Sequence, residues 1–150
     1  MRCMRLLIQR VNKADVTVNN SIVGQINKGL CVFVGIAATD TVATLEKMAE
    51  KLICLRIFED DNEKMNLSLS DIQGQALLVS QFTLLADCSK GRRPAFVGAG
   101  DPEHAKALYE QFCQIVQQKG IFVQTGIFAA DMVVHIENDG PCTFWLDSEK

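Results

Sequence analysis

The sequence has few of the residues that build metal centres or disulfide frameworks. Only two of its 150 residues are histidines, His104 and His135, and its six cysteines form no CxxC pair. Structural zinc sites need closely spaced Cys and His ligands, so the sequence predicts no metal and no other cofactor. Cys31 and Cys54 lie in apolar stretches, and we expect them to be small core residues.

Long apolar runs and an export signal are also missing. The first ten residues, MRCMRLLIQR, contain only three consecutive strongly apolar residues, and no segment approaches the length of a membrane-spanning helix. Together with unpaired cysteines, this pattern predicts a cytoplasmic protein without a membrane partner. Proline is scarce too, with three residues, and one of them forms an unusual Gly140-Pro141 pair close to the C-terminus.

Charge of one sign does not dominate the chain. A formal net charge of −3 argues against a surface that attracts nucleic acid everywhere. Lys90, Arg92 and Arg93 nevertheless make a compact cationic loop, which is either a phosphate-binding loop or an ordinary solvated one. Apolar residues make up 48% of the chain and no linker composition divides it, so we expect a single domain over residues 1–150.

The apolar periodicity predicts two helices among seven or eight strands. The first helix is expected from Thr41, with Asp40 as its N-cap and a stripe that extends to Arg56, and the second runs from Asp101 to Gly120. Strands are expected at 4–9, 14–18, 21–26, 30–36, 76–85, 121–125, 131–137 and 138–146. Since strands and helices do not alternate strictly, the pattern favours an α+β fold with a largely antiparallel or mixed sheet.

Two short motifs carry chemistry. Ser80-Gln81-Phe82-Thr83 gives a buried strand a polar end, where backbone N–H groups and hydroxyls could hold a carbonyl or an oxyanion. A half-buried strand that turns polar side chains to water is the alternative. Gly140-Pro141 is either an ordinary turn or a pair that exposes a carbonyl in an unusual direction.

Taken together, these segments resemble the D-aminoacyl-tRNA deacylase family over essentially the entire chain. The resemblance rests on SQFTL (80–84) and on the Asn-x-Gly-Pro-x-Thr pattern that begins at Asn138. KGRRPAF and TGIFAADM (125–132) lie between them. Cys142 stands where valine is usual in the family and Cys88 where threonine is usual, and neither change removes a group that the chemistry needs.

The resemblance implies a barrel-like sheet and a homodimer with two sites at the subunit interface. Each site would combine the SQFTL segment of one subunit with a cis Gly140-Pro141 of the other. That pair would form a wall that excludes L side chains from the substrate pocket and admits D-amino acids and glycine. Asn138 and Met132 are implied to belong to the same substrate-binding region.

The implied reaction is hydrolysis of the ester that joins a D-amino acid, or mischarged glycine, to the 3′-terminal adenosine of tRNA. Backbone N–H groups around Gln81, Phe82 and Thr83 would polarise the ester carbonyl, and water would attack with help from the ribose 2′-OH. Ser80 and Phe82 would help to hold the adenosine. Thr83 as a covalent nucleophile is the competing mechanism.

Two other functions stay open. A dimeric module could hold tRNA or another polyanion through the Lys90–Arg93 loop without turnover. A hydrolase could instead use Cys142 or Thr83 on an unrelated acyl substrate. Neither His104, in the first turn of a helix, nor His135, in a strand, has a partner that the sequence reveals.

Overall fold

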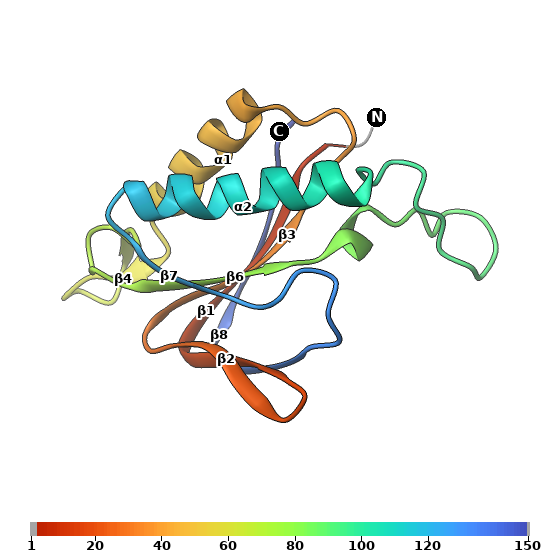
Figure 1. Cartoon of the computed structure of the whole chain (residues 1–150). Coiled ribbons are helices and arrows are strands. Elements are labelled where there is room, and N and C mark those ends of the chain that lie inside the picture. The colour runs from red at the N-terminus through yellow and green to blue at the C-terminus, as the bar shows by residue number, and fades with distance from the viewer. Residues whose placement is uncertain (1–2, 150) are drawn as a thin grey trace.

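The computed structural model describes residues 3–149 of the chain (Figure 1). Over that range the chain forms eight strands, two α-helices and one 3₁₀ helix. The strands are β1 (Arg5–Val18), β2 (Ser21–Ile26), β3 (Gly29–Gly35), β4 (Phe58–Glu59), β5 (Met65–Leu67), β6 (Gln75–Ser80), β7 (Phe122–Thr125) and β8 (Val133–Asp147). The helices are α1 (Val42–Cys54), the 3₁₀ helix η1 (Phe82–Leu85) and α2 (Pro102–Gln118).

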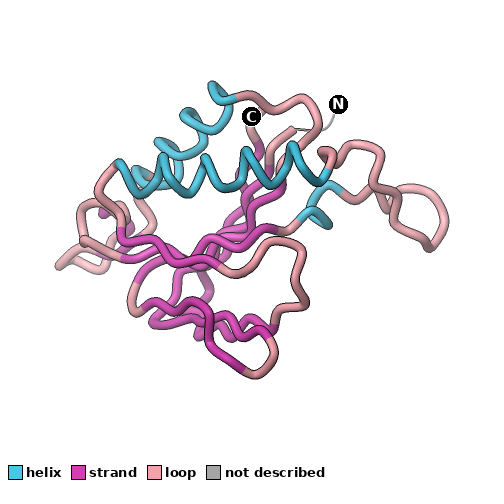
Figure 2. The backbone as a smooth tube through the Cα atoms, viewed as in Figure 1, coloured by secondary structure: helices cyan, strands magenta, loops and turns pink. Residues whose placement is uncertain are grey.

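The main sheet is mixed. Its strands follow the order β2-β1-β3-β6-β7, and β8 pairs with β1 as well. The pairs β3–β6 and β6–β7 are parallel, whereas β1 runs antiparallel to β2, β3 and β8. The strongly twisted sheet is nearly closed, and both α-helices lie on the same side of it (Figure 2). The predicted α+β class with a barrel-like mixed sheet and two main helices is therefore confirmed.

The core has two parts because the central strands are buried on both faces. Alternate residues of β3, such as Leu30 and Val32, face the two α-helices in the larger cluster. Cys31 faces the opposite way, into a smaller cluster with Leu77 and Val79 of β6. A continuous apolar run of strand length is typical of this placement, and the prediction that 30–36 is buried on both faces is confirmed.

Two pairs of predicted strands are in fact single long strands. The segments expected at 4–9 and 14–18 join into β1, which remains paired through its polar middle. The strands expected at 131–137 and 138–146 join into β8. This strand continues past Gly140-Pro141 because it pairs antiparallel with β1 on both sides of that pair. Pairing with a neighbouring strand overrides local polarity and turn signals, so the sequence alone divided both strands wrongly.

The ends of the helices confirm one predicted cap and correct another. Asp101 caps α2 by accepting a hydrogen bond from the N–H of His104, and Gly120 follows the helix with a φ of 94°. In α1 the N-cap is Thr41, not Asp40, and the helix ends at Cys54, before Arg56. Asp40 is buried and accepts hydrogen bonds from the backbone N–H groups of Met4 and Ala37 instead.

The remaining sequence predictions for the fold need two more corrections. The predicted strand 76–85 stops at Ser80, and the chain then turns into η1. Cys54 is exposed, because it occupies the last position of α1, whereas Cys31 is buried as expected. No helix among residues 3–149 is both long and apolar enough to cross a membrane.

Candidate active site

A cavity of about 470 Å³ opens where β6 ends, at the first residues of the SQFTL motif. This volume lies within the range of roughly 300–1,000 Å³ that is common for small-molecule sites. Ser80, Gln81 and Phe82 form one side of it, and residues 128–132 with Val134 form another. The cavity therefore brings three of the predicted catalytic residues together with the predicted substrate-binding residue Met132.

The turn that follows Ser80 leaves some backbone N–H groups without an acceptor. The N–H of Gln81 continues the parallel ladder and donates to the carbonyl of Val34 at 2.8 Å. The N–H groups of Phe82 and Thr83 have no acceptor among residues 3–149, because they open a 3₁₀ helix whose first donors lack an internal partner. Of the three predicted donor positions, Gln81 is thus occupied, and Phe82 and Thr83 remain available.

The side chains of the motif form a local pair. The amide Nε2 of Gln81 donates to Oγ1 of Thr83 at 2.5 Å, and Thr83 is exposed. Thr83 does not line the cavity. An amide that donates a hydrogen bond cannot take a proton from a hydroxyl. Within the described part of the chain, no base accompanies Thr83 for the nucleophilic role.

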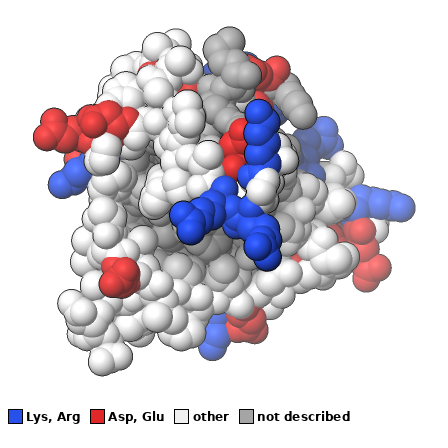
Figure 3. Space-filling view, turned by 90° about the vertical axis from the view of Figure 1, so that its right-hand side faces the viewer, with Lys and Arg blue, Asp and Glu red and all other residues white. Residues whose placement is uncertain are grey.

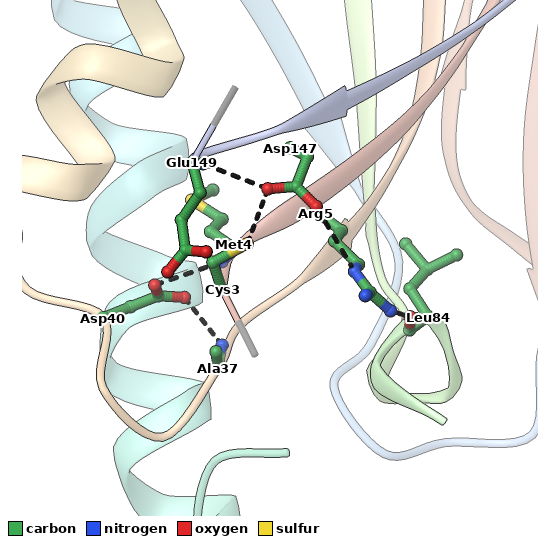
Figure 4. Close-up of polar contacts among 8 residues, drawn as sticks. All are labelled: Cys3, Met4, Arg5, Ala37, Asp40, Leu84, Asp147 and Glu149. Atoms are coloured by element: carbon green, nitrogen blue, oxygen red, sulfur yellow. Dashed lines mark hydrogen bonds and ion pairs between the residues drawn. The ribbon is translucent and has the colours of Figure 1, made fainter. Parts of the chain in front are cut away.

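Arg5 anchors this turn from β1, as Figure 4 shows. Its Nη1 donates to the carbonyl of Leu84 at 2.6 Å, its Nε lies 3.8 Å from Oδ2 of Asp147, and its guanidinium is 5.4 Å from the Trp145 ring centroid. Gly35 of β3 lies under the same turn, where a Cβ atom would come 2.5 Å from the Leu85 side chain. Sequence reasoning identified neither Arg5 nor Gly35, since only tertiary pairing brings them to η1.

The other wall of the cavity contains a residue with an unusual backbone conformation. Ala129 has a φ of 65°, in the left-handed region that alanine seldom adopts. Met132 lies close by against Gly126, where a Cβ atom would come 2.5 Å from its Sδ. Such outliers concentrate at functional sites. Residues 128–132 of the segment TGIFAADM thus form a wall of the cavity, with Met132 among them.

Gly140-Pro141 lies in a wide bulge of β8, and its peptide bond is cis, as the resemblance implied. Thr143 pairs with Gln9 and Asn138 with Val11, so residues 139–142 together face Arg10 alone. Both Gly140 and Pro141 are exposed. Asn138 closes the bulge, since its Nδ2 donates to the carbonyls of Arg10 and Cys142 at 3.0 and 3.2 Å.

Arg10 holds the bulge through a buried guanidinium. Its residue is 5% exposed, and its Nε lies 3.0 Å from Oδ2 of Asp139. Its Nη1 donates to the carbonyl of Ile57 at 2.8 Å, and Nη2 is 3.9 Å from Glu59. Burial of a charge is costly unless it is paired, so this network fixes Asp139 next to Gly140. Arg10 lies between the predicted strands 4–9 and 14–18, so the sequence contained no signal for this role.

The two predicted parts of the site do not meet within one chain. Gly140, Pro141 and Asn138 are not among the residues that line the cavity. Gly140 lies six positions beyond Val134 along β8, which corresponds to a length of about 20 Å along the strand. The described chain therefore presents the SQFTL turn with its cavity and the cis Gly140-Pro141 bulge as separate exposed features.

The predicted cationic loop projects from the molecule next to η1 (Figure 1, right). Lys90, Arg92 and Arg93 are all exposed, and none of them forms an ion pair within residues 3–149. The side of the molecule that carries this loop shows Lys and Arg side chains gathered near its centre (Figure 3). This gives an acidic protein one local concentration of positive charge.

Histidines and cysteines supply no second site. His135 pairs with Asp15 at 2.8 Å on the surface, and His104 lies in the first turn of α2. In the part of the chain that the structure describes, no three His, Cys, Asp or Glu residues are grouped to hold a metal ion. Burial raises the pKa of Cys31 and Cys113 to about 12, so both thiols are protonated at neutral pH.

Comparisons with solved structures identify the class of fold. A structure named c-Myc DNA Unwinding Element Binding Protein superposes with a TM-score of 0.91 at 39% identity, covering 95% of this chain and 97% of that one. A probable eukaryotic D-amino acid tRNA deacylase superposes with a TM-score of 0.83 at 21% identity, covering 96% and 98%. The latter likeness shows a shared fold.

Sequence comparisons identify the family. The profile described as D-Tyr-tRNA(Tyr) deacylase matches residues 7–147. A D-aminoacyl-tRNA deacylase of Clostridium perfringens is 54% identical over 147 residues, which covers 98% of this chain and 99% of that protein. The chain belongs to the D-Tyr-tRNA(Tyr) deacylase family, whose members are hydrolases that act on ester bonds.

Proposed function

We propose that this protein hydrolyses the ester bond of D-aminoacyl-tRNA and releases the free D-amino acid and tRNA. The observation that carries the proposal is the turn at the end of β6, which lines a cavity of about 470 Å³ and in which the backbone N–H groups of Phe82 and Thr83 have no acceptor among residues 3–149. Family membership supports the substrate class, since the relative from Clostridium perfringens is named for this activity.

The proposed mechanism relies on positioning and on backbone donors. The N–H groups of Phe82 and Thr83 bind the carbonyl oxygen as negative charge develops there, while Ser80 and Phe82 hold the terminal adenosine. Water adds to the carbonyl carbon, with the ribose 2′-OH assisting. The bond between the carbonyl carbon and the ribose oxygen then breaks, and the ribose oxygen takes a proton that the attacking water gives up. An aminoacyl ester is already activated, so the reaction needs no strong protein nucleophile.

Selectivity is assigned to Gly140 and Pro141 of a second subunit. Both residues are exposed, and the cavity contains neither of them, which supports a homodimer in which each bulge completes the partner's site. Backbone carbonyls form a wall that an L side chain strikes and a D side chain avoids. Glycine has no side chain, so the glycyl ester passes the same wall. Asn138 keeps the bulge closed, and Met132 lines the pocket.

The loop with Lys90, Arg92 and Arg93 is proposed to contact tRNA phosphates. Its three exposed cations suit a polyanion, and such contacts weaken as salt is raised. We expect the reaction to take place in the cytoplasm and to need no cofactor.

The test compares matched D-Tyr-tRNA, L-Tyr-tRNA and Gly-tRNA as substrates of the wild type and of Thr83→Ala. We expect rapid loss of the D and glycyl esters, with the L ester spared. Retained activity in Thr83→Ala rules out the threonine nucleophile. Equal hydrolysis of the L and D esters contradicts the Gly140-Pro141 wall, and no hydrolysis of any ester contradicts the proposed activity.

A second candidate is a binding module that holds nucleic acid without turnover. The exposed cationic loop favours it, as does the DNA-binding name of the 39% identical structure. A module that only binds nucleic acid does not need backbone N–H donors without an acceptor in a turn that lines a cavity, so we rank this function second. Retained RNA binding without ester hydrolysis would support it.

A further inference from the structure

Two exposed phenylalanines form a pair at the rim of the cavity. Phe82, in η1, is 56% exposed and Phe96, in the loop before α2, is 40% exposed. Their ring centroids are 5.1 Å apart and their planes are inclined by 53°. Phe82 is one of the residues that line the cavity, whereas Phe96 is not. Large apolar rings that face water in contact with each other provide a ready surface for another flat ring.

The loop that carries Phe96 is fixed at both ends. Asp87 and Ala95 exchange two backbone hydrogen bonds of 2.7 and 2.9 Å, which close the loop just before Phe96. On the other side, the carbonyl of Phe96 accepts from the N–H of Ala99 at 3.1 Å, and the N–H of Gly100 donates to Ile36 at 3.2 Å. The backbone therefore presents Phe96 to Phe82 at a defined position.

Positive charge lies on the same loop. The closed segment between Asp87 and Ala95 contains Lys90, Arg92 and Arg93, all exposed. An aromatic platform next to a cluster of cations is the arrangement with which proteins hold single-stranded nucleic acid, because bases stack on the rings while cations contact the backbone phosphates. This charge distinguishes the surface from an ordinary apolar contact.

We propose that Phe96, packed against Phe82, forms a stacking surface for the unpaired base that precedes the terminal nucleotide of the substrate, while Phe82 holds the terminal adenosine. The cavity takes the terminal aminoacyl nucleoside, and Lys90, Arg92 and Arg93 hold the phosphates of the same strand. This inference rests on the proposed function. It adds a contact to the penultimate nucleotide and gives Phe96 a role in binding that is separate from the chemistry.

The experiment compares three D-tyrosyl esters of increasing length: adenosine, the dinucleotide cytidylyl-adenosine, and tRNA. Variants are Phe96→Ala, Phe96→Leu and Phe96→Trp. Phe122→Ala is the matched control, because Phe122 is 52% exposed and lies on β7 outside the cavity lining and the aromatic pair. Stacking on an aromatic side chain is worth enough for alanine to lower affinity about 5- to 150-fold per base.

We expect Phe96→Ala to raise KM for the dinucleotide and tRNA esters by that factor, with the adenosine ester hydrolysed as by the wild type. Phe96→Trp should bind the dinucleotide and tRNA esters as tightly as the wild type does, and Phe96→Leu should lose most of this affinity. Phe122→Ala should behave as the wild type does. The length-dependent loss is the signature of a second base site, since general damage to η1 affects all three esters equally.

Three outcomes overturn the inference. One is an equal loss on all three esters, and another is no loss on any. The third is dissociation of an oligomer by Phe96→Ala in sedimentation measurements, which assigns the pair to a contact between copies of the chain. Failure of the proposed function looks different, because the wild type then hydrolyses none of the three esters.

Discussion

Two arginines of β1 hold two backbone elements, and they do so by different means. Arg5 reaches the SQFTL turn through the carbonyl of Leu84, and Arg10 reaches the Gly140-Pro141 bulge through Asp139. Both elements present main-chain groups rather than reactive side chains. The positions of those groups depend on the side chain that anchors each segment.

The surroundings of the two arginines differ. The side chain of Arg10 is 7% exposed and lies between the two carboxylates of Asp139 and Glu59. That of Arg5 is 17% exposed, donates to the neutral carbonyl of Leu84, and has one carboxylate near it, that of Asp147 at 3.8 Å. Loss of a partner from a buried charge costs far more than loss of one neutral contact. The bulge should therefore be rigid and sensitive to substitution, and the turn more tolerant.

The largest effect is expected for Asp139→Asn, which removes the closest carboxylate from Arg10 while keeping its shape. Asp139 is 39% exposed, so solvent reduces the cost, and we expect the free energy of unfolding to fall by about 1–3 kcal/mol. The wall also loses its fixed position, so the preference for D over L esters should fall at least about tenfold, the equivalent of ~1.4 kcal/mol. Urea denaturation and paired D- and L-Tyr-tRNA assays measure these two effects.

The matched control for Asp139→Asn is Glu137→Gln on the same strand, β8, which breaks an exposed ion pair with Lys13 of β1. An exposed pair contributes at most about 1 kcal/mol, so this variant should resemble the wild type. Equal losses in the two variants would show that the buried environment of Arg10 has no special importance.

A smaller effect is expected for Arg5→Ala. The variant loses the hydrogen bond to Leu84, the contact with Trp145 and the 3.8 Å ion pair with Asp147. The free energy of unfolding should therefore fall by about 1–2 kcal/mol. Since the turn carries the proposed donors, kcat should fall more than KM rises, and Arg5→Lys should restore part of the rate. Steady-state kinetics on D-Tyr-tRNA provide the measurement.

Lys47→Ala is the control for Arg5→Ala, because Lys47 also donates to a backbone carbonyl, that of Ser148 at 2.8 Å, away from the turn. It should lose a similar small amount of stability and no rate. If both variants lose the same rate, Arg5 stabilises the protein without positioning the turn.

The smallest effect is expected for Cys142→Val, inside the bulge. Cys142 is 6% exposed and fills space much as valine does, so the change in stability should stay below about 1.5 kcal/mol with unchanged activity. Iodoacetamide should modify the exposed thiols of Cys54 and Cys88 first and leave the enzyme active. Inactivation that substrate prevents would instead indicate a cysteine nucleophile.

Local patterns predicted much of the fold. The helical stripe of α2, its Asp101 cap and its Gly120 end depend on residues a few positions apart, so the sequence contains their whole explanation. The division of β1 and β8 into shorter strands was wrong because the polar stretch that begins at Arg10 and the turn-like stretch 138–141 look like interruptions. They stay in strands since a neighbouring strand pairs around them and Asp139 compensates the buried charge.

The sequence by itself determined the family and the α+β class and pointed to the segments that we propose form the site, since each depends on short-range pattern or on motif letters. Only the tertiary structure decided that the N–H of Gln81 donates to the carbonyl of Val34, while the N–H groups of Phe82 and Thr83 have no acceptor among residues 3–149. It also decided that Phe96 meets Phe82. The physical reason is that a hydrogen-bond partner or a packed ring comes from a distant part of the chain, and no local pattern specifies which group arrives there.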